Sequence, residues 1–91
     1  MNYGSHQLKK FKLAGADWTI KYTDTIHDLG RTDPETFTIY VNTKQPKQGQ
    51  DMALAHEVVH AILFTMGKRD HDEEFVEGFA QLLYQYEKQA V

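Results

Sequence analysis

Two segments in the first half of the chain alternate apolar and polar residues. They are residues 18–23 and residues 37–42. A period of two is that of a β-strand with one buried face. In the second segment, Phe37, Ile39 and Val41 would lie together on that face. The pattern therefore predicts two strands of a sheet that packs one face on a core.

The segments around these strands complete an expected sheet half, residues 1–50. Residues 10–13 predict a further short strand, which ends at a turn at Gly15. Residues 30–35 contain glycine, aspartate and proline and predict a turn or loop. Short strands separated by such turns favour a small antiparallel sheet.

The second half, residues 51–91, is helix-forming, and its first helix is predicted from about residue 51 to residue 66. Gly67 is a natural C-terminal stop for it. Apolar residues lie on nearly every side of this helix, which predicts that it is buried within the domain. They are Met52, Leu54, Val58, Val59, Ile62, Leu63 and Met66.

A second helix is predicted from a cap at Asp70 or Asp72 to about Lys88. Its apolar residues have the three-and-four spacing of a helix that packs one stripe on a core. They are Phe75, Val76, Phe79, Leu82, Leu83 and Tyr86, with the stripe centred on Phe75 and Phe79. Together the patterns predict one α+β domain over the whole chain, with the sheet packed on two C-terminal helices.

Composition and charge narrow the possible partners. The 91 residues are 41% hydrophobic and 25% charged, the balance of an ordinary globular protein. A net charge of −3 without a basic run argues against nucleic acid as a partner. No signal peptide or membrane-spanning run is visible, so we expect a cytoplasmic protein without a membrane partner. Cysteine is absent, so any metal ligands must be His, Asp or Glu.

The first predicted helix carries the motif H-E-x-x-H as His56, Glu57 and His60. Histidines four residues apart project from one helix face, the spacing at which two imidazoles share one tetrahedral metal ion, here expected to be Zn²⁺. In this motif the glutamate is the general base that takes a proton from the metal-bound water. Satisfied core histidines are the alternative, but two imidazoles and a carboxylate are costly to bury unless paired or metal-bound.

A third ligand must come from another segment, because no further histidine follows in the metzincin spacing. The candidates gather at the start of the second helix: His71, Asp72, Glu73, Glu74 and Glu77. Helical phase places Glu73 nearest the core edge and ranks it ahead of Glu77, Glu74 and His71, in that order. Glu77, one turn on, would support a ligand histidine. The alternative role of the acidic run is to stabilise the helix N-terminus, by about 0.3–1 kcal/mol per carboxylate.

These residues resemble the gluzincin arrangement, in which H-E-x-x-H on one helix is followed by a glutamate ligand on the next. Many gluzincins have E-x-x-x-D on that second helix, and Glu73 and Glu77 match this pattern with Glu in place of Asp. The resemblance implies that Glu73 binds zinc and that Glu77 stands behind a ligand histidine.

From about residue 18 to residue 86, the chain is also similar to small metallopeptidases encoded by phages and prophages. It resembles IrrE/ImmA-type proteases of mobile elements more loosely. The shared pattern is Ile39-Tyr40-Val41-Asn42, Pro46, the motif, Glu73-Glu74-Phe75-Val76 and Leu83-Tyr84-Gln85. The resemblance implies a minimal zincin-like domain in an intracellular setting, encoded by a phage or prophage.

The favoured hypothesis is therefore a zinc-dependent metallopeptidase, a hydrolase of peptide or protein substrates with Glu57 as general base. If residues 37–42 form a sheet edge, an extended substrate would pair with them. One alternative is a non-catalytic, zinc-stabilised protein-binding or regulatory module of a phage or mobile element. Another is a zinc hydrolase of nucleic acid or a small amide, which the acidic charge disfavours for nucleic acid. The pattern specifies no oligomeric state.

Overall fold

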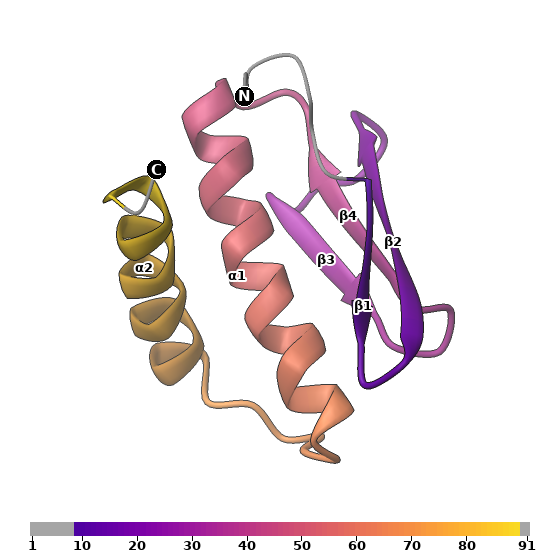
Figure 1. Cartoon of the computed structure of the whole chain (residues 1–91). Helices are drawn as coiled ribbons and strands as arrows, with labels where there is room; N and C mark the ends of the chain where they lie inside the picture. Colours follow the sequence, from indigo (N-terminus) through magenta and orange to yellow (C-terminus); the bar gives the residue numbers. More distant parts are fainter. Residues whose placement is uncertain (1–8, 90–91) are drawn as a thin grey trace.

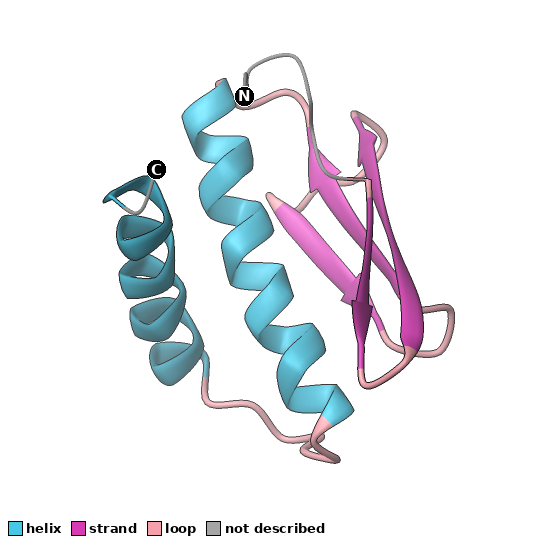
Figure 2. Ribbon diagram, viewed as in Figure 1, coloured by secondary structure: helices cyan, strands magenta, loops and turns pink. Residues whose placement is uncertain are grey.

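The structure, a computed structural model, describes residues 9–89 and has a four-stranded sheet followed by two helices (Figures 1 and 2). This confirms the predicted α+β class and the division into a sheet half and a helical half. The elements in chain order are β1 (Lys10–Leu13), β2 (Ala16–Thr23), β3 (Gly30–Asp33), β4 (Thr38–Asn42), α1 (Lys47–Thr65) and α2 (Glu73–Gln89).

The strand order in the sheet is β1-β2-β4-β3. β1 pairs with β2 and β3 pairs with β4 in antiparallel fashion, as expected, but β2 and β4 run parallel. The sheet is thus mixed, and the expectation of a wholly antiparallel one does not hold for its central pair. The reason is that the chain leaves β2 for the far edge, forms β3 there, and returns through a hairpin, so that β4 enters beside β2 in the same direction.

β3 occupies residues that the sequence predicted as a loop, so that prediction was wrong for Gly30–Asp33. Its residues lack apolar alternation, and its strand conformation comes from pairing with β4. The turn follows at residues 34–37 instead and includes Phe37, which has a positive φ of 52°. Phe37 therefore lies outside β4 and meets the edge of the Trp18 ring, with centroids 5.4 Å apart.

Asn42, the last residue of β4, is buried and holds the segment that leads into β3. Its Nδ2 donates to the carbonyl oxygens of Ile26 and Asp28, each at 3.0 Å. Its Oδ1 accepts from the backbone N–H of Lys44 at 2.8 Å. One buried amide thus ties the β2–β3 connection to the start of the link into α1.

α1 lies between the sheet and α2, as Figure 1 shows. On its sheet side the core consists of Trp18, Ile20, Ile39, Val41 and Ala61. On its other side a second cluster consists of Ala55, Val59, Val76 and Ala80. The first helix is thus covered on two sides, as predicted, although Met52 and Met66 of its predicted apolar set are exposed. α2 packs on α1 and adds a third layer.

The end of α1 and the start of α2 follow the predicted signals, whereas α1 begins earlier than predicted. α1 begins directly after Pro46, four residues earlier than predicted, and the predicted stop is confirmed by Gly67 with φ +82° just beyond its end. At the start of α2, Asp72 Oδ1 accepts from the N–H of Glu74 at 3.0 Å, so Asp72 is the cap. Within residues 9–89 neither helix has the length and apolar character that crossing a membrane requires.

The orientation of α2 differs from the prediction. Phe75 and Phe79, expected at the centre of the buried stripe, are exposed, whereas Val76 and Ala80 face α1. The smaller side chains let the two helices approach closely, and this orientation also turns the neighbouring carboxylates toward the histidines of α1. The prediction that the buried stripe of α2 is centred on Phe75 and Phe79 was therefore wrong. The interface with α1 is instead centred on the neighbouring Val76 and Ala80.

Candidate metal centre

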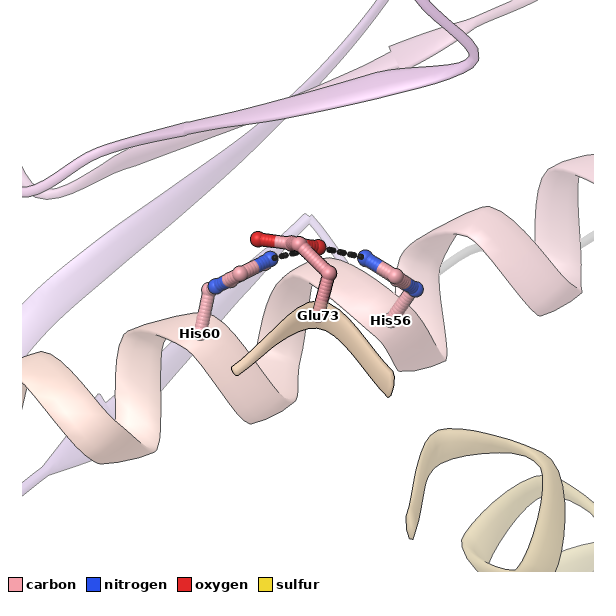
Figure 3. Close-up of side chains that lie close together, drawn as sticks. All are labelled: His56, His60 and Glu73. Atoms are coloured by element: carbon pink, nitrogen blue, oxygen red, sulfur yellow. Dashed lines mark ion pairs between the residues drawn. The ribbon is translucent and has the colours of Figure 1, made fainter. Parts of the chain in front are cut away.

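The two histidines of the motif and Glu73 lie together between α1 and the first turn of α2. Figure 3 shows both imidazoles pointing to the same Glu73 carboxylate. Glu73 Oε1 lies 3.4 Å from His56 Nε2 and 3.4 Å from His60 Nε2. One ligand atom from each residue lies within 4.8 Å of the others, so the group could hold a metal ion.

The spacing of these atoms fits a shared metal ion. With metal–ligand bonds of about 2.0–2.1 Å, the corners of a tetrahedron lie about 3.3 Å apart. Both distances from Glu73 to the histidines have this value within about 0.1 Å. Good hydrogen bonds between nitrogen and oxygen are shorter, at about 2.7–3.2 Å. The two distances from Glu73 therefore fit an ion shared with the histidines, and the three ligand atoms lie close enough together to hold one.

His56 is held in the tautomer that a metal ligand needs. Its Nδ1 lies 2.8 Å from Glu77 Oε1, and because a carboxylate only accepts, Nδ1 carries the proton. Nε2 is then left with its lone pair directed toward Glu73. This hydrogen bond, and to a lesser degree one from Gln81, lowers the pKa of Glu77. Glu77 thus lies behind a histidine of the group, where the sequence predicted it.

His60 is oriented by a chain of hydrogen bonds that the sequence did not reveal. His71 Nε2 lies 2.7 Å from the Lys68 carbonyl oxygen, which only accepts, so this nitrogen donates. His71 Nδ1, in the neutral ring, therefore accepts from His60 Nδ1 at 2.6 Å. His60 Nε2 is left with its lone pair toward Glu73. Burial lowers the pKa of His60, which favours the neutral ring that binds metals.

The remaining candidates for the third ligand lie outside this group. His71 directs both ring nitrogens at His60 and Lys68. Asp72 caps α2, and Glu74 is exposed. Among the side chains of residues 9–89, His56, His60 and Glu73 form the only set of three His, Cys, Asp or Glu with the spacing of a metal site. The sequence marked His71 only as a candidate ligand; its contact with His60 was not predicted, because it depends on the link folding back over α1.

Glu57 is almost completely buried between α1 and β3, with 7% of its surface exposed. Its Oε1 accepts from the Thr32 hydroxyl at 2.6 Å. Burial raises the pKa of Glu57, against the opposing effects of the Thr32 hydrogen bond and the nearby His56. A raised pKa makes the carboxylate a stronger base.

β3 passes so close to Glu57 that Gly30 has no room for a side chain. A Cβ at that position would lie 2.9 Å from Glu57 Cγ and 3.1 Å from its Oε2. Gly30 and Thr32 together thus fix where the carboxylate lies. The sequence analysis expected Gly30 and Thr32 in a loop, so their contact with Glu57 was not predicted.

A cleft of about 780 Å³ opens over the metal group. Glu57, His56, His60 and Glu73 line it, together with residues of β3. β3 is an edge strand of the sheet, whereas β4 is flanked by β2 and β3. The hypothesis that residues 37–42 form a substrate-binding edge is therefore wrong, and β3 is the edge that adjoins the cleft.

Comparison with known proteins returned no match, either to a protein family, to a curated protein or to a solved structure.

Proposed function

We propose that this chain is a zinc-dependent metallopeptidase that hydrolyses peptide bonds. The observation that carries the proposal is the convergence of His56 Nε2, His60 Nε2 and Glu73 Oε1 beside the buried Glu57, in an open cleft. Two imidazoles and one carboxylate are a ligand set that catalytic zinc sites use, and they leave a fourth position of the tetrahedron free. The gluzincin pattern of the motif and of Glu73 supports the same assignment.

When bound, zinc would supply a Lewis acid that acidifies water and polarises the scissile carbonyl group. Glu57 takes a proton from the attacking water and delivers it to the leaving amine. Thr32 holds Oε1, and Oε2 accepts no hydrogen bond within residues 9–89, so Oε2 is the oxygen that exchanges the proton. The raised pKa of Glu57 suits this role.

The free edge of β3 provides a place for an extended substrate. Gly30–Asp33 pairs with β4 on one side only and lines the cleft beside the metal group. A peptide that adds a strand there would gain main-chain hydrogen bonds independent of its sequence. On this proposal, substrate selectivity comes from the side chains that line the cleft, and a folded protein would be cut only in an extended segment.

The test compares the zinc-loaded chain with its Glu57→Gln variant on a mixture of unfolded proteins, with new peptide termini read by mass spectrometry. We expect zinc-dependent cleavage that Glu57→Gln abolishes, while its zinc affinity changes less than about tenfold because Glu57 is not a ligand. Glu74→Gln makes the same chemical change at an exposed carboxylate and should keep full activity. Equal cleavage by Glu57→Gln, or none by the zinc-loaded chain, would overturn the proposal.

A second candidate is a non-catalytic module in which zinc only joins α1 to the start of α2. The enclosure of Glu57 between Thr32 and Gly30 favours it, because a buried base has restricted access to water. In that case Glu57→Gln would alter neither partner binding nor zinc affinity, and zinc would stabilise the fold without any new peptide termini.

A further inference from the structure

The outer face of α2 carries a continuous apolar stripe, which we call the outer stripe. It consists of Phe75, Phe79, Leu82 and Tyr86, which are 52%, 48%, 69% and 67% exposed. At about 100° per residue, the four side chains fall within about 60° of one another. Val76 and Ala80 face α1, so the stripe points away from the rest of the described chain.

The outer stripe has the area of an apolar patch that often serves as a binding surface. With about 200 Å² for a large side chain, it exposes roughly 470 Å². The largest apolar patch of a typical monomer is about 300–600 Å² and is often a binding surface. The metal group uses Glu73 and the opposite face of α2, so the proposed active site does not explain the stripe.

Gly78, beside the stripe, adds an independent observation. It lies inside α2, where glycine is less favourable than alanine. A Cβ there would meet nothing within 4 Å, so packing within the described chain does not require glycine. A missing side chain on an exposed helix face allows the backbone of another helix to approach closely.

We propose that the outer stripe binds a second copy of this chain, with the two α2 helices antiparallel. The four residues of the outer stripe are spaced symmetrically about a point between residues 80 and 81, so a twofold axis there matches each stripe to its copy. Phe75 then lies opposite Tyr86 of the partner copy, and Phe79 lies opposite its Leu82. The two stripes would bury roughly 940 Å², and the flanking glutamines and glycine bring the interface to about the 1,000 Å² that a specific contact needs.

Charge supports the antiparallel arrangement. The first turn of α2 is acidic, with Glu73 and Glu74. The outer stripe itself holds no charged residue. An antiparallel pair opposes the two helix dipoles and keeps the two acidic starts at opposite ends of the interface. A parallel pair would instead bring the acidic starts together.

The first test is sedimentation equilibrium of the whole chain from about 1 to about 200 µM, the range expected for an interface of this size. We expect a monomer–dimer equilibrium that Leu82→Lys weakens at least tenfold. Met66→Lys is the matched control: Met66 is 63% exposed, lies at the end of α1 and gains the same charge. It should dimerise like the unmodified chain. A monomer at all concentrations, or equal effects of the two variants, would overturn the proposal.

The orientation is tested by crosslinking, since the chain has no cysteine of its own. Phe75→Cys and Tyr86→Cys variants are treated with a short bismaleimide, separately and mixed. In the antiparallel dimer the mixture crosslinks and each variant alone does not, because identical positions lie about 16 Å apart along the helix axis. Crosslinking of each variant alone would show a parallel pair and contradict the proposed interface.

Discussion

The two faces of α2 differ in a way that reverses the usual relation between side-chain size and burial. The fully buried positions against α1 are the small residues Val76 and Ala80, with Leu83 and Tyr84 partly buried at their edge, whereas Phe75 and Phe79 lie on the exposed face. Where the small Val76 and Ala80 meet α1, the inner face packs closely and also brings the carboxylates of Glu73 and Glu77 to the histidines of α1. Apolar content alone therefore does not identify the core face of a helix that also carries ligands.

The sharpest way to test this comparison is to place the same charge on each face. Val76→Asp puts a carboxylate into a site with no exposure, and we expect it to cost more than about 4 kcal/mol in the free energy of unfolding. Leu82→Asp on the outer stripe should change it by less than about 0.5 kcal/mol, because Leu82 is largely exposed. Urea denaturation at about 1 µM, where the proposed dimer dissociates, measures both. Similar losses in the two variants would mean that the faces are not distinct.

Because the inner face of α2 carries Glu73, metal binding should also raise the free energy of unfolding of the domain. If zinc binds His56, His60 and Glu73, it joins α1 to α2, and free zinc at 100 times its Kd should stabilise the fold by about 2.7 kcal/mol. In a domain of this size that corresponds to a rise in Tm of roughly 10–20 °C. Thermal melts with zinc and with a chelator measure the difference.

Glu73→Gln and Glu74→Gln form the matched pair for this experiment. The first removes the candidate ligand and should abolish the effect of zinc on Tm, and the second should preserve it. A zinc effect that survives Glu73→Gln would assign the third ligand to another group.

The features that sequence could predict are those set by local periodicity. The helix with H-E-x-x-H, its stop at Gly67 and the cap at Asp72 all follow from neighbours within a few residues. The ranking of Glu73 used a stripe centre that is exposed in the structure, and Glu73 still meets the histidines because it lies beside Val76 and Ala80, which face α1. The grouping of Glu73 with the two histidines then needed only two antiparallel helices in contact.

The features that sequence could not predict depend on contacts between distant segments. β3 has no strand pattern and is held by β4 and by the Thr32–Glu57 hydrogen bond. The parallel pairing of β2 with β4 follows from that strand. The orientation of α2 depends on the fit of Val76 and Ala80 to α1, which competes with the larger apolar stripe and prevails.

The last prediction concerns His71, which contacts the metal-binding His60 of the proposed site and is expected to have the smallest effect. His71 lies in the link before α2, packs on Phe64 with ring centroids 4.4 Å apart, and its Nδ1 accepts a hydrogen bond from the N–H of His60 Nδ1. His71→Phe keeps an aromatic ring but removes the acceptor, so His60 loses the partner that selects its tautomer. We expect zinc affinity to fall about 10- to 100-fold, the usual cost of losing such a partner. Competition with a chromogenic chelator measures the affinity.

His71→Asn provides the control, because its amide oxygen can accept from His60 Nδ1 and should restore part of the lost affinity. A purely structural role for His71 predicts the opposite order, since phenylalanine would preserve the packing on Phe64 and asparagine would not. Higher affinity in His71→Asn than in His71→Phe therefore assigns the effect to the hydrogen bond. The reverse order would reduce His71 to a packing residue, and the orientation of His60 would then have to come from the burial of its ring on α1.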